Sequence, residues 1–234
     1  MRVIRQAPWL IVNFSKPHRA LSWAIVGGGF ARTTAVSWLE VRNQDLPPDI
    51  DPRQFLFDRM AERGLENTVG LLTSRKLDAY VDVEKSYEGI SARCIATVGL
   101  SNALRAGDPP SLAPRAGTVN ILCRVSRPLS QDALVESLSI AVEARTAAIL
   151  TAEIPSFVTG RHATGTGTDC VVMVSPEGET AEPYAGKHTA IGHAVGAAVF
   201  EAVAHGAAKW KEEWSAGLIQ KNTEEKGLLC SEIR

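Results

Sequence analysis

The first part of the chain alternates between apolar, β-branched runs and short polar breaks. Residues 9–14 read WLIVNF and residues 20–30 read ALSWAIVGGGF, with the polar stretch SKPH between them. Two such runs around a polar break predict a β-hairpin with its turn at 15–18, which ends at the glycine triplet 27–29. The next β-branched and aromatic run, TTAVSWLEVR at 33–42, predicts a further strand.

Helical spacing begins after Pro52, where RQFLFDRMAERG places apolar residues three and four positions apart up to Gly64. This pattern predicts a short helix with a C-terminal glycine cap. Three apolar, β-rich runs follow and are expected to be strands: NTVGLLTSR at 67–75, ISARCIATVGL at 90–100 and AGTVNILCRVS at 116–126.

Two long helices are predicted in the last part of the chain. Ser130 is an N-cap residue, and the apolar positions after it recur at spacings of three and four up to Ile149. DCVVMVS at 169–175 predicts a strand, and the Ala-rich stretch 188–210 predicts the second helix. Because the strands come in runs before each helix, we expect an α+β fold with a largely antiparallel sheet or sheets, covered by two long helices and one short helix.

Composition narrows the class of protein further. The chain has 234 residues, 45% hydrophobic and 22% charged, with a formal net charge of -1, which is typical of a globular protein. No basic excess indicates a nucleic-acid partner, and no run reaches the roughly 20 apolar residues of a membrane span. We therefore expect a cytoplasmic protein with a single domain over 1–207 and a charged, flexible tail over 208–234.

The cysteines favour a reducing compartment. Cys94, Cys123, Cys170 and Cys230 form no C-x-x-C pair, and three of them lie in apolar runs. A reduced thiol in such a run usually packs as a small hydrophobic group. The spacing excludes a zinc ribbon.

The strongest candidate for chemistry is the stretch RHATGTGTDCVVMV at 161–174. His162 and Asp169 flank alternating threonines and glycines, so an extended loop would present a row of hydroxyls on one side. Asp169 could then act as a base or orienting group, with His162 as a proton shuttle. An equally weighted interpretation is a turn in which Asp169 accepts local backbone hydrogen bonds.

A second candidate, YAGKHT at 184–189, precedes the last predicted helix. His188 or Thr189 could cap that helix, and its free N–H groups could bind an anion. His188 and His193 are five positions apart and share no helix face, so a two-histidine metal site is disfavoured and no catalytic metal is expected.

Three further positions carry polar groups inside apolar patterns: Ser22 and Asn120 in predicted strands, and Glu143 beside Arg145 in the first long helix. A solvent-exposed face of the sheet would explain the polar residues Ser22 and Asn120 without any function. Nucleotide-binding motifs are weak, because the glycines at 27–29 lack the G-x-G-x-x-G spacing and no P-loop lysine is present.

Taken together, five segments resemble the adenosylcobinamide amidohydrolase family of cobamide salvage. These segments cover positions between about 8 and 205 and read LSWAIVGGGF (21–30), NTVGLLTSR (67–75), AGTVNILCRVSRPLSQDALVESLSIAVEARTAAI (116–149), ATGTGTDCVVMVS (163–175) and YAGKHTAIGHAVGAAVFEAV (184–203). His193 departs from the family pattern, where an acidic residue is as natural, and the tail after about Ala207 has no counterpart.

The resemblance implies hydrolysis of the amide that joins the aminopropanol arm to the corrin ring of adenosylcobinamide, or of a related cobamide, which gives adenosylcobyric acid for cobalamin salvage. The resemblance implies a corrinoid as the partner. It implies no protein-bound cofactor, because the cobalt belongs to the substrate. The family motifs, carried over by position, fall on Ser22, Gly28, Gly29, Asn120, Glu143, Thr164, Gly165, Thr166, Gly167, Thr168, Asp169, Tyr184, Gly186, His188 and Thr189.

Two mechanisms follow from the resemblance and the chemistry of amides. In the first, Asp169 or His162 activates water, the glycine-rich backbone stabilises the oxyanion and His188 protonates the leaving amine. In the second, Ser22 or a loop threonine is the nucleophile.

A non-catalytic corrinoid-binding protein and a nucleotide-binding TGTGTD loop stay open as alternative functions. The sequence also leaves three questions open: whether cobinamide or a complete cobamide is the substrate, whether the adenosyl ligand is needed, and whether the protein is a homo-oligomer.

Overall fold

The computed structural model describes residues 1–110 and 116–219. Its strands are β1 (Arg2–Gln6), β2 (Trp9–Ser22), β3 (Gly29–Glu40), β4 (Val69–Thr73), β5 (Val81–Tyr87), β6 (Ile90–Val98), β7 (Ala103–Leu104), β8 (Val119–Val125), β9 (Gly165–Thr166) and β10 (Cys170–Pro176). Its α-helices are α1 (Pro52–Ala61), α2 (Gln131–Thr151) and α3 (Ala190–Ser215), and short 3-10 turns occupy Asn43–Asp45 and Leu77–Ala79.

An eight-stranded sheet runs in the order β4-β3-β2-β10-β8-β6-β5, and β1 pairs with β2 beside this path. Only β3–β4 and β8–β10 are parallel among the pairs of this sheet in the described residues. The expected α+β fold, with a largely antiparallel sheet, two long helices and one short helix, is therefore confirmed. The short strands β7 and β9 form a separate two-stranded sheet.

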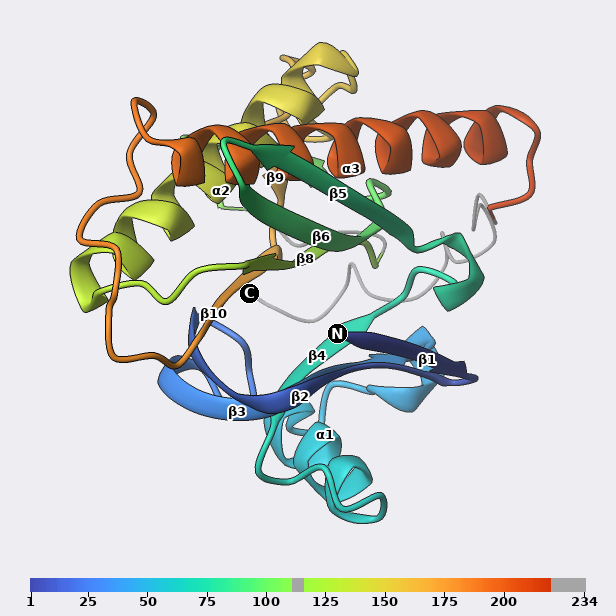
Figure 1. The fold of residues 1–234 in the computed structure, drawn as a ribbon. Coiled ribbons are helices and arrows are strands. Elements are labelled where there is room, and N and C mark those ends of the chain that lie inside the picture. Colours follow the sequence, from blue (N-terminus) through green and yellow to red (C-terminus); the bar gives the residue numbers. More distant parts are fainter. Residues whose placement is uncertain (111–115, 220–234) are drawn as a thin grey trace.

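The large sheet bends so that its two halves face each other, and β10 joins them (Figure 1). An apolar layer fills the space between the halves, with side chains such as Leu10 and Trp38 from one half and Ile95 and Leu122 from the other. All four side chains are fully buried. The sheet thus contributes both walls of this inner core.

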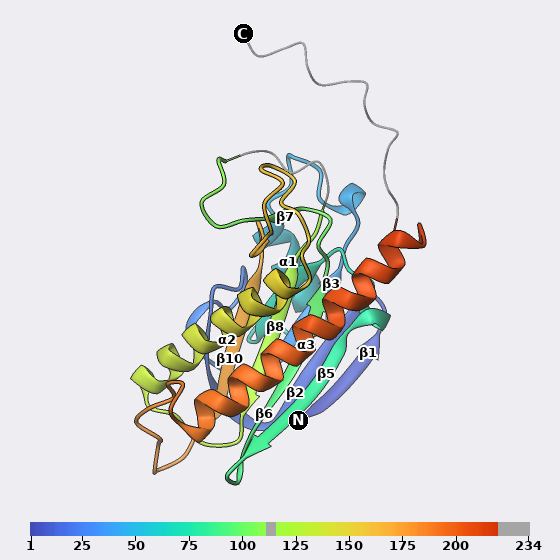
Figure 2. The same ribbon diagram turned by 90° about the horizontal axis from the view of Figure 1, so that it is seen from above.

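The helices cover the two outer faces of the bent sheet. Helices α2 and α3 lie side by side over β5, β6, β8 and β10 (Figures 1 and 2), where Ile121, Met173, Ile149 and Val199 belong to one buried cluster. On the opposite outer face, Leu56 and Met60 of α1 pack in a smaller cluster with Leu39 of β3. The two long helices place the candidate residues of α2 and of the 184–189 segment near each other.

The hairpin turn predicted at 15–18 is wrong, because β2 continues through this stretch. The ladder between β2 and β3 shifts register between Asn13 and His18, and Pro17 falls in the interrupted part. A proline without an N–H is tolerated at such a bulge, so the polar break marks an irregularity within one strand. The turn actually lies at 23–28, where Gly27 has φ of 69° and leads into β3.

The predicted helix starts agree with the structure. The hydroxyl of Ser130 accepts a hydrogen bond from the N–H of Ala133 at the start of α2, and Thr189 caps α3 by accepting from the N–H of Gly192. The predicted boundary at 207 falls inside α3, which continues to Ser215 because Trp210 is buried and extends its apolar face. Of the tail predicted over 208–234, residues 208–215 belong to α3 and residues 220–234 lie outside the described part of the chain.

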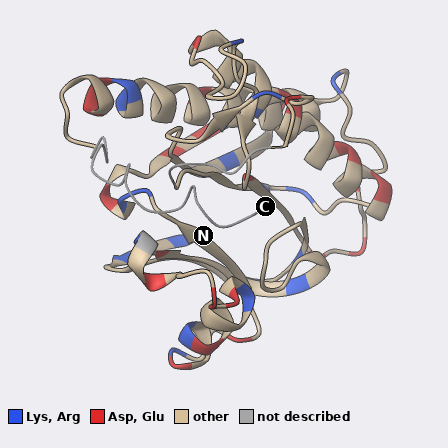
Figure 3. Cartoon of the chain, turned by 180° about the vertical axis from the view of Figure 1, so that it is seen from behind, with Lys and Arg blue, Asp and Glu red and all other residues tan. Residues whose placement is uncertain are grey.

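Charged groups of both signs occur along α1 and towards the C-terminal end of α3 (Figure 3). Cys94, Cys123 and Cys170 are free and buried, whereas Cys230 lies outside the described residues. Within the described ranges, no helix combines the length and apolar character that a membrane span requires.

Candidate active site

The predicted site residues separate into two groups on different sides of α2. Glu143 and Arg145 are two positions apart on this helix, a rotation of about 200°. Glu143 forms an ion pair with Lys187 in the segment before α3, whereas Arg145 pairs with Asp169 at the start of β10. The helix therefore lies between the TGTGTD loop and the YAGKHT segment, which the sequence analysis had combined into a single site.

Asp169 is the centre of the first group, and its carboxylate is surrounded by donors. Oδ1 accepts hydrogen bonds from the Thr166 hydroxyl at 2.5 Å and the Val119 N–H at 3.0 Å. Oδ2 accepts from the Thr166 N–H at 3.0 Å and lies 3.4 Å from Arg145 Nη1. The local hydrogen bonds of the turn interpretation are present, together with a hydroxyl and a cation that the turn itself does not require.

Burial dominates the electrostatics of this carboxyl group. The Asp169 side chain is only 6% exposed, and desolvation raises its pKa, although the Arg145 charge and the Thr166 hydrogen bonds act in the opposite direction. A carboxylate with a raised pKa is a better proton acceptor for a bound hydroxyl than a solvated one. A hydroxyl, a carboxylate and a cation are thus in contact here, the set of groups that nucleophilic catalysis requires.

The other loop residues hold the loop in place. The Thr168 hydroxyl donates to the Gly117 carbonyl, and the Thr164 hydroxyl accepts from the N–H of Ala106. These two hydroxyls therefore bind to neighbouring backbone and do not form the expected row of free groups. A Cβ at Gly165 would lie 2.2 Å from Asp169 Oδ2, so the glycine is needed for the carboxylate to reach its donors, while Gly167 faces only Leu104.

Ser22 and Asn120 lie on the inner face of the sheet, close to the same end. Asn120 is opposite Cys170 in the β8–β10 ladder and donates to the Leu72 carbonyl at 2.6 Å. The Ser22 hydroxyl is buried and accepts from the Ala24 N–H at 3.3 Å. Their positions agree with support of the sheet end, and the nucleophilic role of Ser22 stays a prediction.

Gly28 and Gly29 belong to the β2–β3 turn. A Cβ at Gly28 would lie 2.4 Å from the Ala24 carbonyl oxygen, and Gly29 has φ of 83°. Both positions therefore require glycine for backbone reasons.

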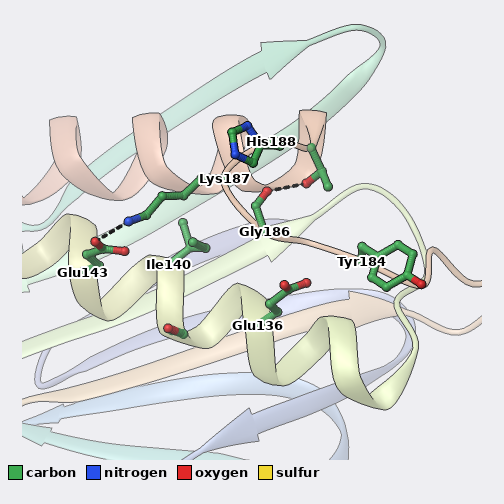
Figure 4. Close-up of a pocket in the computed structure, with 9 residues that line it drawn as sticks. Glu136, Ile140, Glu143, Tyr184, Gly186, Lys187 and His188 are labelled. Carbon is green, nitrogen blue, oxygen red and sulfur yellow. Dashed lines mark hydrogen bonds and ion pairs between the residues drawn. The ribbon is translucent and has the colours of Figure 1, made fainter.

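The second group lines a pocket of about 560 Å³ between α2 and the segment before α3 (Figure 4). Its walls are Glu136, Ser139, Ile140, Glu143, Tyr184, Gly186, Lys187, His188 and Thr189. Five of these nine lining residues were already candidates from the sequence, and the other four were not. The pocket thus brings Glu143, Tyr184, Gly186, His188 and Thr189 together.

Two carboxylates of α2 hold the pocket segment. Glu136 Oε2 accepts from the Ala185 N–H at 2.7 Å, and Glu143 Oε1 lies 2.5 Å from Lys187 Nζ. The Thr189 hydroxyl donates to the Gly186 carbonyl at 2.8 Å, which closes the turn into α3 (Figure 4). This turn fixes the backbone on either side of His188.

The three candidate histidines lie apart. His162 is exposed on the loop before β9, where its carbonyl accepts from Arg105. His188 is exposed in the pocket, and His193 of α3 is also exposed, with its ring centroid 4.5 Å from that of Tyr87. Within residues 1–110 and 116–219, no group of three or more His, Cys, Asp or Glu side chains is placed to hold a metal ion.

Three residues of these groups, Glu136, Lys187 and Trp23, were not predicted as site residues from the sequence. Glu136 is an ordinary charged position on a helix surface, and its bond to Ala185 spans 49 positions, so the pattern carries no signal for it. Lys187 lies inside the YAGKHT motif and could have been chosen with its neighbours. Trp23 is part of an apolar run, yet its indole N–H donates to the Asp169 carbonyl at 2.5 Å.

Known proteins can be compared with this arrangement. The family model described as adenosylcobinamide amidohydrolase matches residues 1–215. Two curated relatives bear that name. The protein from Methanosarcina mazei is 27% identical over 191 residues, covering 77% of this chain and 86% of the relative. The protein from Halobacterium salinarum is 35% identical over 176 residues, covering 68% of each.

Solved structures give weaker similarity. The PH0078 protein from Pyrococcus horikoshii OT3 aligns with a TM-score of 0.45 and 13% identity, covering 85% of this chain and 76% of that chain. A beta-aminopeptidase from Burkholderia sp. aligns with a TM-score of 0.42 and 11% identity, covering 85% and 78%. The family assignment rests on the sequence match over residues 1–215, and by it the chain belongs to the adenosylcobinamide amidohydrolases.

Proposed function

We propose that this amidohydrolase cleaves the amide between the aminopropanol arm and the corrin ring of adenosylcobinamide, or of a related cobamide, and releases adenosylcobyric acid for cobalamin salvage. The observation that carries the proposal is the family match over residues 1–215. Two curated relatives with the same activity in their names support it. The geometry around Asp169 is compatible with the chemistry of this amide.

Thr166 is the nucleophile in this proposal. Its hydroxyl already donates to Asp169 Oδ1, and the carboxylate accepts or faces four donors in total, which matches its lone-pair capacity. A water molecule activated by Asp169 would have to displace one of these donors, whereas Thr166 needs no rearrangement. The loop-threonine mechanism is therefore favoured over water activation.

The proposed steps balance in protons and bonds. The Thr166 oxygen attacks the amide carbon while its proton moves to Asp169, and the C–N bond then breaks as Asp169 protonates the departing 1-amino-2-propanol. Water attacks the resulting ester with Asp169 as base, which releases the carboxylic acid and returns the proton to Thr166. Arg145 keeps Asp169 oriented through their ion pair, and its buried Nε has no partner in the described residues.

The pocket at His188 then has a binding role. A corrinoid is larger than a drug-sized ligand, and the pocket of about 560 Å³ is within the range that holds drug-sized molecules. Tyr184, His188 and Lys187 offer hydrogen-bonding groups to a peripheral carboxamide. Because the side-chain amides of the corrin are chemically alike, such distant contacts would select which one reaches Thr166.

The test is incubation of the purified protein with adenosylcobinamide and detection of adenosylcobyric acid by mass spectrometry. Thr166→Val should lose activity by about a hundredfold or more, and Thr166→Ser, which keeps a hydroxyl, should retain part of it. Thermal unfolding of both variants separates loss of chemistry from loss of fold.

Other outcomes would contradict specific parts of the proposal. A folded Thr166→Val protein with full activity would exclude the threonine nucleophile and return attention to water activation. Saturable binding of adenosylcobinamide without any acid would favour the non-catalytic corrinoid-binding alternative.

Proton transfers alone suffice for the proposed steps, so we also propose that no protein-bound cofactor takes part. Activity should then survive dialysis against a chelator. Loss of activity that added zinc restores would contradict this.

A further inference from the structure

Two large aromatic side chains remain exposed beside the Asp169 group. Trp23 is 46% exposed and Phe30 is 53% exposed, although they flank the tight β2–β3 turn. Trp23 lies between Ser22 and Ala24, which are both buried on the inner face of the sheet. Two large exposed aromatic side chains at the ends of one turn add apolar surface of the kind that ligand-binding sites present.

The backbone fixes these rings on one face. Phe30 is the cross-strand partner of Leu21, and Leu21 packs against the cluster beneath α2 and α3, so both side chains lie on the α2 side of the sheet. Trp23 follows Leu21 by two positions, and its indole N–H is held by the Asp169 carbonyl. The edge of the indole is thus anchored to the proposed reaction centre while much of the ring stays accessible.

A second pocket lies between Phe30 and the start of α2. A pocket of about 270 Å³ is lined by Phe30, Arg19 and Arg32 from the strands and by Gln131 and Leu134 from the helix, with Ala20 and Ala31. Leu134 and Arg145 are 11 positions apart, about three helical turns, so they lie on the same side of α2. The pocket therefore offers Phe30 and two guanidinium groups near the start of α2, and the Arg145–Asp169 pair lies on the same side of this helix about three turns further along.

We propose that Trp23 and Phe30 form a platform on which the corrin macrocycle of the substrate lies. This inference rests on the proposed function and adds to it the surface on which the corrin ring binds. A corrin is a large flat ring with apolar faces and a rim of carboxamides, so it needs stacking area together with donors at the edge. Arg19 donates to the Leu129 carbonyl and Arg32 to Glu177, and each guanidinium has further N–H groups for carboxamide oxygens.

The experiment measures binding of cobyric acid by equilibrium dialysis, with corrin absorbance as the readout. Cobyric acid has the ring without the scissile arm, so its affinity does not depend on hydrolysis. Trp23→Ala and Phe30→Ala should each weaken binding by about tenfold. Phe200→Ala is the matched control, because Phe200 is a 39% exposed aromatic residue on α3, away from the pocket at Phe30, and this variant should bind like the unaltered chain.

The outcomes separate this inference from the proposed function. If the chain binds cobyric acid and the two variants lose affinity, the platform stands even when no amide is cleaved. If adenosylcobinamide is hydrolysed but Trp23→Ala and Phe30→Ala both keep the original affinity and KM, the platform is excluded. A dimer that either variant converts to a monomer, with unchanged cobyric acid affinity, would assign this face to self-association and also exclude the platform.

Discussion

His18 lies at the bulge of β2, and two hydrogen bonds fix its neutral form. Nδ1 lies 2.9 Å from the Lys16 carbonyl, to which it donates, and Nε2 lies 2.9 Å from Arg124 Nε, from which it accepts. Its ring stacks on Phe14 at 4.5 Å. Burial, and then the Arg124 charge, lower the pKa of His18 below its ordinary 6.5, despite the opposing carbonyl contact.

The free energy of unfolding should therefore depend on pH through His18. Above pH 6.5 both states are neutral, and as pH falls below 6.5 the unfolded chain takes up the proton first, so stability decreases until the folded pKa is passed. Chemical denaturation between pH 5 and 8 should show a smaller decrease for His18→Gln than for the unaltered chain. His205→Gln, at an exposed position of α3, serves as control; equal pH dependence in all three proteins would contradict the role of His18.

At the same scale, the sequence predicted only the contacts that are local. Threonines and glycines before Asp169 suffice to predict a turn in which the carboxylate accepts neighbouring N–H groups. The Arg145 partner could not be predicted, because Arg145 interrupts a helix pattern in the same way as a solvated residue does. Its contact with Asp169 depends on the packing angle between α2 and β10, which hydrophobic periodicity does not specify.

Two glycines of α3 provide a test at the scale of elements. A Cβ at Gly192 would lie 2.2 Å from the Gly186 carbonyl oxygen, whereas a Cβ at Gly196 would meet Ile140 Cγ2 at an ordinary 3.7 Å. Gly192→Ala should therefore displace the pocket segment and destabilise the fold by about 1–3 kcal/mol. Gly196→Ala should be neutral or stabilise by about 0.5–1 kcal/mol, because alanine is favoured within helices.

Denaturant unfolding measures both effects, and cobyric acid affinity reports on the pocket. Equal stability of the two variants would show that the 184–189 segment adapts to the added methyl group.

Whether a segment is a helix or a strand was predicted more accurately than the residues at which it begins and ends. The helix starts at Ser130 and Thr189 carry cap residues, and cap chemistry is local. The strand β2 was divided in the prediction because Pro17 and its polar neighbours also typify turns. Only the pairing partner decides between a turn and a bulge, and β3 is not identifiable as that partner from β2 alone.

For the whole molecule, the inner apolar layer joins the two halves of the sheet. Leu122 of β8 is fully buried there, with side chains of both halves in the same cluster. Leu122→Ala should lower the free energy of unfolding by about 2–5 kcal/mol. Leu218→Ala, at a 72% exposed position, should change it by less than about 0.5 kcal/mol; similar losses in both variants would indicate that the halves are not coupled through this layer.

The position of β10 along the chain also determines the order of assembly. It pairs with β2 on one edge and β8 on the other, so residues 170–176 must leave the ribosome before the halves can join. Until then the edges of β2 and β8 are unpaired during synthesis, and such edges promote association between nascent chains. We therefore expect this protein to accumulate in soluble form more efficiently when chaperones are abundant.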